Sequence, residues 1–87
     1  MKVSTNNLVF LSFKSGSKDD RDWLYVNLMD DDGNIIKVYS DSRFINDIKS
    51  FVSSLPSGEP VVVVFDLYPS YDGKSFRAML NNISYSE

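Results

Sequence analysis

The sequence predicts an all-β or β-rich fold: a barrel of five strands with one α-helix between the third and fourth strands. Two short glycine turns, Asp31-Asp32-Gly33 and Asp72-Gly73, are each flanked by segments in which apolar and polar residues alternate. This alternation around a tight turn is typical of a β-hairpin. Residues 42–54 separate the two hairpins and carry apolar residues at helical spacing, and the apolar residues 8–14 precede both hairpins.

The length and composition indicate one small folded domain. The chain has 87 residues, of which 43% are hydrophobic, and this suffices for one core. We expect a single domain over residues 1–87, with the polar residues 1–7 as a loose N-terminal segment. No apolar run approaches the roughly 20 residues that span a bilayer, and the first residues do not form a signal-peptide pattern. We therefore expect cytoplasmic residence and no membrane partner.

The chain contains neither histidine nor cysteine. Their absence removes imidazole and thiolate as metal ligands, the usual general base near neutral pH and any thiol nucleophile. The sequence also has no glycine-rich phosphate loop and no Gly-x-Ser-x-Gly turn. We expect no enzymatic activity, catalytic residue, metal site, cofactor or small-molecule substrate.

The net charge is −3 and the isoelectric point is about 4.7. This balance disfavours indiscriminate binding to nucleic acid or to anionic membranes, although a local basic face remains compatible with it. The acidic residues cluster at Asp19-Asp20, at Asp22 and at residues 30–32. Such clusters usually lie in solvated turns, and binding of a divalent metal is the weaker alternative.

The first hairpin has a predictable register. If residues 31–33 form a three-residue loop in which Gly33 supplies the positive φ, Leu28 pairs with Ile36 and Tyr25 pairs with Tyr39. The same register pairs Met29 with Ile35 and Val26 with Val38. One face then carries Leu24, Val26, Leu28, Ile36 and Val38, and the other carries Trp23, Tyr25, Asn27, Met29, Ile35, Lys37 and Tyr39. A slip by one residue would mix the two sets, so the pattern favours this register.

The helix and the flanking segments follow from local signals. Residues 8–14 are expected as a first strand largely buried on both sides, and residues 15–20 as a flexible loop. Asp41 or Ser42 can cap a helix that runs to about Ser54. Its apolar face would carry Phe44, Ile45, Ile48, Phe51, Val52 and Leu55.

The second hairpin begins with the strongest strand signal in the chain, residues 61–68. A two-residue turn at Asp72-Gly73 pairs Tyr71 with Lys74, Tyr68 with Arg77, Leu67 with Ala78 and Phe65 with Leu80. Val63, Phe65, Leu67, Ala78 and Leu80 then face inward, and the last strand ends near Tyr85. This element order predicts an OB-type barrel. An open α+β sheet covered by one helix is the alternative.

The outward face of the first hairpin combines aromatic rings with basic side chains. Aromatic rings stack on nucleic-acid bases, and cations pair with phosphates. The candidate nucleic-acid-binding residues on this face and on the two hairpins are Lys14, Lys18, Arg21, Trp23, Tyr25, Lys37, Tyr39, Tyr68, Tyr71, Lys74 and Arg77. Two other interpretations remain open. Cross-strand aromatic pairs also stabilise a sheet without any ligand, or they can form a protein interface.

A resemblance supports the nucleic-acid interpretation. Residues 23–39 and 61–83, with Phe65-Asp66-Leu67-Tyr68 and Gly73-Lys74-Ser75-Phe76-Arg77-Ala78, resemble the small OB-fold single-stranded-DNA-binding proteins of phages and mobile elements, the class of the filamentous-phage gene-five protein. The resemblance covers the last three-quarters of the chain. It implies a dimer that coats single strands inside a bacterial host cell. The chain differs from that class in its acidic charge and its longer predicted helix.

These observations together predict non-specific binding of single-stranded DNA, with RNA as the alternative strand, in replication of phage or mobile-element DNA. The alternative function is a phage or mobile-element accessory module that binds a protein through the same aromatic face. Val62 and Val64 should point outward from an apolar strand and therefore need a cover. The N-terminal segment or a second copy of the chain could supply it, and we expect a homodimer.

Overall fold

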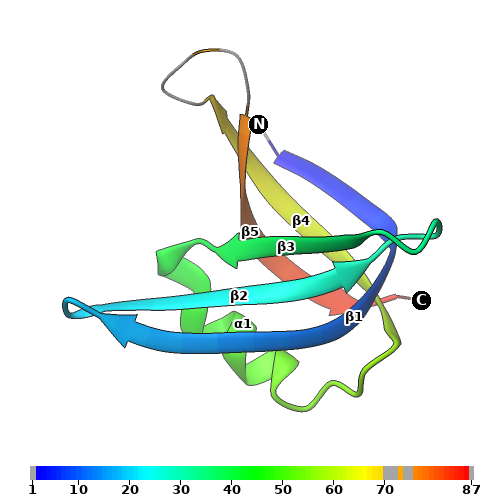
Figure 1. Cartoon of the computed structure of the whole chain (residues 1–87), viewed down its shortest axis with the longest axis horizontal. Helices are drawn as coiled ribbons and strands as arrows, with labels where there is room; N and C mark the ends of the chain where they lie inside the picture. Colours follow the sequence, from blue (N-terminus) through cyan, green and yellow to red (C-terminus); the bar gives the residue numbers. More distant parts are fainter. Residues whose placement is uncertain (1, 70–72, 74–75, 87) are drawn as a thin grey trace.

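The computed structural model describes residues 2–69, 73 and 76–86. Five strands form a closed barrel in the order β1-β2-β3-β5-β4, and the helix α1 follows β3 (Figure 1). The elements are β1 Lys2–Lys18, β2 Arg21–Met29, β3 Ile35–Ser40, the 3₁₀ turn η1 Ser42–Phe44, α1 Ile45–Val52, β4 Glu59–Pro69 and β5 Phe76–Tyr85. Neighbouring strands are antiparallel except β3 and β5, which are parallel. The predicted β-rich OB-like barrel, with its helix between the third and fourth strands, is confirmed.

Strand β1 is long and curved, and its two halves pair with different strands. Its first half pairs with β4, from Lys2 opposite Asp66 onward, and its second half pairs with β2 up to Lys18 opposite Arg21. Irregular pairing between Thr5 and Leu8 and between Phe10 and Ser12 accompanies the strong curvature of this strand in Figure 1. Such bulges increase local twist and bend a strand.

Three sequence expectations for this strand are wrong. Residues 8–14 are not largely buried on both sides, because Ser12 and Lys14 are exposed. Residues 2–7 are not a loose segment, because their backbone pairs with the apolar strand β4. Residues 15–18 are not a flexible loop but the end of β1, and only Asp19 and Asp20 form the turn, with φ of 52° and 62°. Residues 2–5 pair with a strand distant in sequence, and residues 15–18 pair with β2 across the adjacent turn, so a polar composition does not prevent strand formation.

The hairpin of β2 and β3 has the predicted register. Leu28 lies opposite Ile36 and Tyr25 lies opposite Tyr39. Gly33 has a φ of 84°. The carboxylate of Asp30 closes the turn, where Oδ1 accepts hydrogen bonds from the backbone N–H groups of Asp32 (3.0 Å) and Asn34 (2.8 Å). The hydrogen bonds from Asn34, chiefly the one from its backbone, lower the pKa of Asp30 below its usual value.

The core lies between the inward face of the barrel and the helix. Leu24, Val26 and Leu28 are fully buried, as the register requires. The helix is shorter than expected because the first turn, residues 42–44, is 3₁₀ and α1 ends at Val52. The buried residues of the helix and of the segment after it are Ile45, Ile48, Val52 and Leu55. Phe44 and Phe51 also pack against the core but are partly exposed. Asp41 caps the first turn by accepting a hydrogen bond from the backbone N–H of Arg43.

The second hairpin also pairs as predicted in its described part. Tyr68 lies opposite Arg77, Leu67 opposite Ala78 and Phe65 opposite Leu80. The predicted pair of Tyr71 with Lys74 lies outside the described residues. The register shifts at Asn81, whose side-chain amide donates a 2.7 Å hydrogen bond to the buried carboxylate of Asp66. A buried carboxylate requires such a donor.

Most of the clustered acidic residues lie in turns, but Asp22 belongs to β2. The side chains of Asp19 and Asp20 are exposed, as are those of Asp31 and Asp32. Across residues 2–69 and 76–86, no three carboxylates come together in an arrangement that could hold a metal ion. The same part of the chain contains no helix with the length and hydropathy needed to cross a membrane.

Candidate ligand-binding face

Three aromatic rings gather on the outer surface of β2 and β3. Trp23 and Tyr25 are two residues apart on β2, and their ring centroids lie 6.0 Å apart with planes nearly parallel, at 10°. Tyr39 meets Tyr25 across the strands at 5.5 Å, with an interplanar angle of 69°. Tyr39 is 45% exposed, and Trp23 and Tyr25 are half-buried. We call Trp23, Tyr25 and Tyr39 the aromatic face.

Two lysines accompany the aromatic face. The ammonium nitrogen Nζ of Lys37 lies 4.3 Å from the ring centroid of Tyr25 and 5.3 Å from that of Tyr39. These distances are within the range of cation–π attraction. Lys14 on β1 lies directly opposite Tyr25, so a row of Lys14, Tyr25 and Tyr39 crosses three strands. Both lysines are exposed, which leaves their charges available to an anionic ligand.

Gly16 makes room for the indole ring. It lies opposite Trp23 in the pairing of β1 with β2, and a Cβ atom at this position would be 2.5 Å from Cζ2 of Trp23. Sequence reasoning did not single out Gly16, because its neighbours Ser15 and Ser17 make the segment resemble a loop. Only the strand register reveals that a small residue is needed there.

The other predicted residues are distributed around this face. Lys18 and Arg21 lie opposite each other in the backbone pairing at the end of the β1–β2 hairpin, and both side chains are exposed. Tyr68 on β4 is 38% exposed and lines a groove together with Trp23 and Tyr39. The structure therefore brings residues of both hairpins together. Tyr71 and Lys74 lie outside the described residues, and Arg77 is described only by its backbone pairing with Tyr68.

A groove of about 510 Å³ adjoins the aromatic face at the end of the barrel. We call it the rim groove; its lining is Asp22, Trp23, Leu24, Tyr39, Ser40, Asp41, Ser42, Ile45, Tyr68, Ala78 and Met79. It lies where β3 and β5 pair through only two residue pairs, Tyr39 with Met79 and Ser40 with Leu80. This volume is typical of sites for small ligands.

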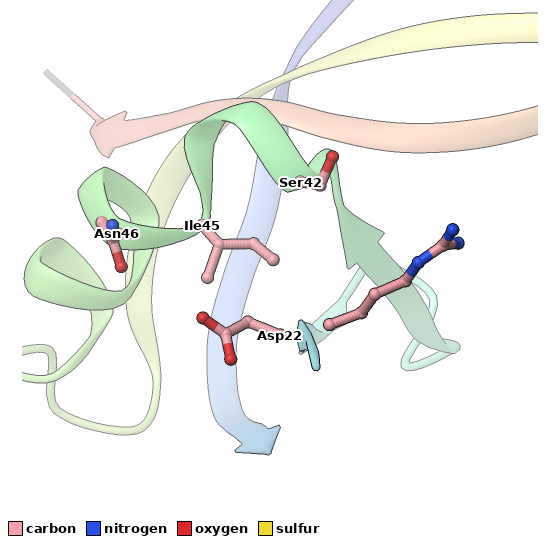
Figure 2. Close-up of a pocket in the computed structure, with 5 residues that line it drawn as sticks. Asp22, Ser42, Ile45 and Asn46 are labelled. Atoms are coloured by element: carbon pink, nitrogen blue, oxygen red, sulfur yellow. The ribbon is translucent and has the colours of Figure 1, made fainter. Parts of the chain in front are cut away.

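A second hollow, of about 390 Å³, continues the rim groove toward the helix and shares three lining residues with it. Figure 2 shows Asp22 with its carboxylate pointing toward the start of α1, where Ile45 and Asn46 lie, and Ser42 on the other side of Ile45 in the turn before the helix. Sequence reasoning missed this hollow because its walls come from β2, from the turn η1 and from the start of α1. No local sequence pattern indicates that these segments lie next to one another.

The two acidic residues of the rim groove differ in what they contact. The carboxylate of Asp41 accepts hydrogen bonds from Nε (3.1 Å) and Nη2 (2.9 Å) of Arg43. These side-chain bonds are the main reason that the pKa of Asp41 lies below its usual value. Asp22 is exposed, and among the described residues none donates a hydrogen bond to its carboxylate. The oxygens of Asp22 are therefore open to a ligand.

Comparison with known proteins supports the fold. No protein-family model matches the chain, and neither does any curated protein sequence. Among solved structures, the chain is similar to a mutant PltB homopentamer of Salmonella typhi with Neu5Ac-alpha-2-3-Gal-beta-1-4-GlcNAc glycans, at a TM-score of 0.59 and 14% identity. The match covers 97% of this chain and 84% of the PltB chain. At this identity the likeness shows the barrel fold alone, and the resemblance to phage DNA-binding proteins stays a prediction.

Proposed function

We propose that this protein binds single-stranded nucleic acid, DNA in the first place, on the outer face of β2 and β3. The observation that carries the proposal is the Lys37 ammonium, held 4.3 Å and 5.3 Å from two tyrosine ring centroids. In OB-like barrels the face of strands 2 and 3 and the adjoining loops bind oligonucleotides and oligosaccharides. The aromatic face occupies this location.

The residue types suit a flexible, negatively charged strand. Each base has a π-face that can stack on a ring, and stacking contributes roughly 1–3 kcal/mol per base without regard to sequence. Lys14 and Lys37 lie beside the rings, where they can neutralise phosphates. Lys18 and Arg21 add two further cations at the end of the same hairpin. The net charge of −3 therefore does not describe this face.

The proposed role is binding without catalysis. Stacking and phosphate pairing are tolerant of sequence, so the protein would coat single strands rather than recognise one site. The sequence resemblance favours replication of phage or mobile-element DNA as the setting. Use of the same aromatic face by a protein partner is the competing explanation.

A titration of fluorescent oligo-dT at two salt concentrations tests the proposal. We expect binding at low salt that weakens steeply as salt rises, because released counterions drive phosphate binding. Fluorescence anisotropy reports the bound fraction directly. Absence of binding at the lower salt concentration would overturn the proposal and favour a protein partner.

A second candidate is binding of a glycan in the rim groove. Aromatic rings beside carboxylate and hydroxyl groups, as in Trp23, Asp22 and Ser42, also suit a sugar ring. The structural neighbour PltB is a protein whose structure contains glycans. Calorimetry with Neu5Ac-alpha-2-3-Gal-beta-1-4-GlcNAc separates the two candidates, since this ligand carries one negative charge and its binding should depend on salt far less than that of oligo-dT. Glycan binding without oligo-dT binding would favour this second function.

We also propose that the protein associates with itself as a homodimer. Val62 and Val64 are half-buried, and Ser4 of β1, opposite Val64, is exposed. Ile35 is 69% exposed on β3. Exposed apolar side chains on a strand favour association. Sedimentation that gives a 9.9 kDa monomer at high protein concentration would exclude the dimer.

A further inference from the structure

We infer that the rim groove and the adjoining hollow together bind the edge of one base through the carboxylate of Asp22, and that they favour guanine over thymine. The inference rests on the proposed binding of single strands and adds a base preference to it. The aromatic face alone would accept any base. Asp22 would therefore be the residue that determines specificity.

The rim groove is continuous with the aromatic face. Trp23 and Tyr39 belong to both, and Tyr68 lines the groove as well. Leu24, Ala78 and Met79 contribute apolar lining, and the adjoining hollow extends the space toward α1. A strand that stacks on Trp23 or Tyr39 can thus direct the next base into the groove. Apolar and aromatic surfaces around a few polar groups are typical of such binding sites.

The charges of the groove decide which part of a strand can enter it. Asp22 and Asp41 place two carboxylates in the rim groove, whose described lining has no basic side chain, and Arg21 is the cation that lines the adjoining hollow. Carboxylates repel phosphates, so the backbone should follow Lys14 and Lys37 on the open face of the sheet instead. A base is neutral and carries N–H donors on its edge. The groove therefore suits the base rather than the phosphate.

Asp22 is the carboxylate that is open to such a donor. The oxygens of Asp41 already accept hydrogen bonds from Arg43. The carboxylate of Asp22 points into the adjoining hollow, toward the start of α1 (Figure 2), and none of the described residues donates a hydrogen bond to it. An exposed carboxylate of this kind has two acceptor oxygens side by side.

Guanine matches this acceptor pair best among the four bases. Its Watson–Crick edge presents two adjacent donors, N1–H and the exocyclic N2 amino group, which can bind both oxygens of one carboxylate. Thymine presents a single N–H between two carbonyl oxygens, and those oxygens repel a carboxylate. Single-stranded bases are commonly read on this edge, and charge-assisted pairs with two parallel bonds are the strong ones.

The test compares three fluorescent oligonucleotides that differ at one central position in a dT strand: thymine, guanine or inosine. Inosine lacks the exocyclic amino group of guanine but keeps N1–H. We expect the wild-type protein to bind the guanine strand about tenfold more tightly than the all-thymine strand, the scale of one bidentate contact. Inosine should lose most of this advantage.

Two variants isolate the carboxylate. Asp22→Asn keeps the shape of the side chain and should remove the guanine preference, while its affinity for the all-thymine strand stays equal or rises. Asp31→Asn removes the same charge from the exposed β2–β3 turn, at the other end of β2, and should keep the preference. Circular dichroism and the emission of Trp23, the only tryptophan, verify the fold of each variant.

The outcomes are distinguishable. Equal affinity of the wild-type protein for all three strands would reject the base preference and leave single-strand binding intact. A guanine preference that survives in Asp22→Asn would reject the role of Asp22. Failure of every oligonucleotide to bind would reject the proposed function itself. Glycan binding that Asp22→Asn abolishes, without any base preference, would assign the rim groove to a sugar and overturn the inference.

Discussion

The indole ring of Trp23 lies directly against Gly16 of the neighbouring strand. A Cβ atom at Gly16 would lie 2.5 Å from Cζ2 and 2.8 Å from Cε2 of the ring, closer than real Cβ contacts allow. Gly16 belongs to the extended strand β1, so the space above it is the reason for a glycine here. The ring can therefore approach the sheet while remaining half-buried, next to Tyr25. One small residue thus positions the first ring of the aromatic face.

Gly16→Ala should displace this ring without unfolding the protein. The nearest atoms belong to the end of a side chain that can shift, and an added Cβ also restricts the unfolded chain, so we expect a stability change within about 1 kcal/mol. Affinity for oligo-dT should fall, and the emission maximum of Trp23 should shift because its environment changes. Ser17→Ala, on the next residue, is the control. Unchanged emission and affinity in Gly16→Ala would show that the contact does not position the ring.

Tyr25→Ala should weaken binding more than it weakens the fold. Loss of one stacked base costs roughly 1–3 kcal/mol of binding free energy. The side chain is half-buried, and loss of a cross-strand aromatic pair costs roughly 0.2–1 kcal/mol of stability. Tyr85→Ala is the matched control because it removes another edge-to-face pair, with Phe51 at 5.0 Å, on β5. Oligo-dT titration and urea unfolding measure the two quantities.

If Tyr25→Ala unfolds the protein, or if its folded fraction binds oligo-dT as the wild type does, the ring is structural. Binding losses of equal size in Tyr25→Ala and Tyr85→Ala would likewise contradict a localised aromatic face.

Lys37→Met should change the salt dependence of binding. Methionine keeps most of the apolar stem beside the tyrosine rings but removes the charge that lies 4.3 Å from the centroid of Tyr25. Each phosphate contact on a single strand contributes a slope of about −0.7 to the plot of log K against log salt concentration. The slope of Lys37→Met should therefore be less steep by about 0.7.

Lys49→Met is the control for this measurement. Lys49 is also exposed, but it lies on α1 and not on the aromatic face. Its slope should equal that of the wild-type protein. Equal slopes for wild type and Lys37→Met would exclude a phosphate contact at Lys37.

The sequence predicts the fold well where local patterns are sufficient. The alternation in residues 24–28 and 36–38 gave the register of β2 and β3, because a slip would have moved apolar side chains into solvent. Gly33 identified the turn by its need for a positive φ. The positions of Trp23, Tyr25, Lys37 and Tyr39 on one outer face follow from the same register.

The features that the sequence did not reveal depend on contacts between different segments of the chain. Residues 2–7 have no strand pattern of their own, and their conformation depends on pairing with β4. The need for a small residue at Gly16 arises only from the ring across the strand. The rim groove requires β2, the start of α1 and the second hairpin to meet, so Asp22 appears in the sequence only as one acid among several. Long-range geometry, rather than composition, creates these parts of the site.

The ion pair of Asp41 with Arg43 should make stability depend on acidic pH. Hydrogen bonds from Arg43 lower the pKa of Asp41 in the folded protein below the ordinary value of 3.8, which applies to the unfolded chain. A group whose pKa falls on folding stabilises the fold at pH values above its unfolded pKa, and this contribution disappears as pH falls through the folded pKa. The free energy of unfolding should therefore decline as pH drops below about 4, and Asp30 should act in the same direction.

Asp41→Asn isolates the contribution of Asp41 because asparagine still caps a helical turn but cannot form the ion pair. The Nη2 atom of Arg43 lies 2.9 Å from Oδ2 of Asp41, and the Arg43 side chain is 64% exposed, so screening by solvent keeps the effect modest. Urea unfolding of both proteins at neutral pH and at a series of acidic pH values measures it. The variant should be less stable at neutral pH, and the two curves should converge in acid as Asp41 becomes protonated. Parallel curves over the whole range would show that the ion pair does not contribute to the pH dependence.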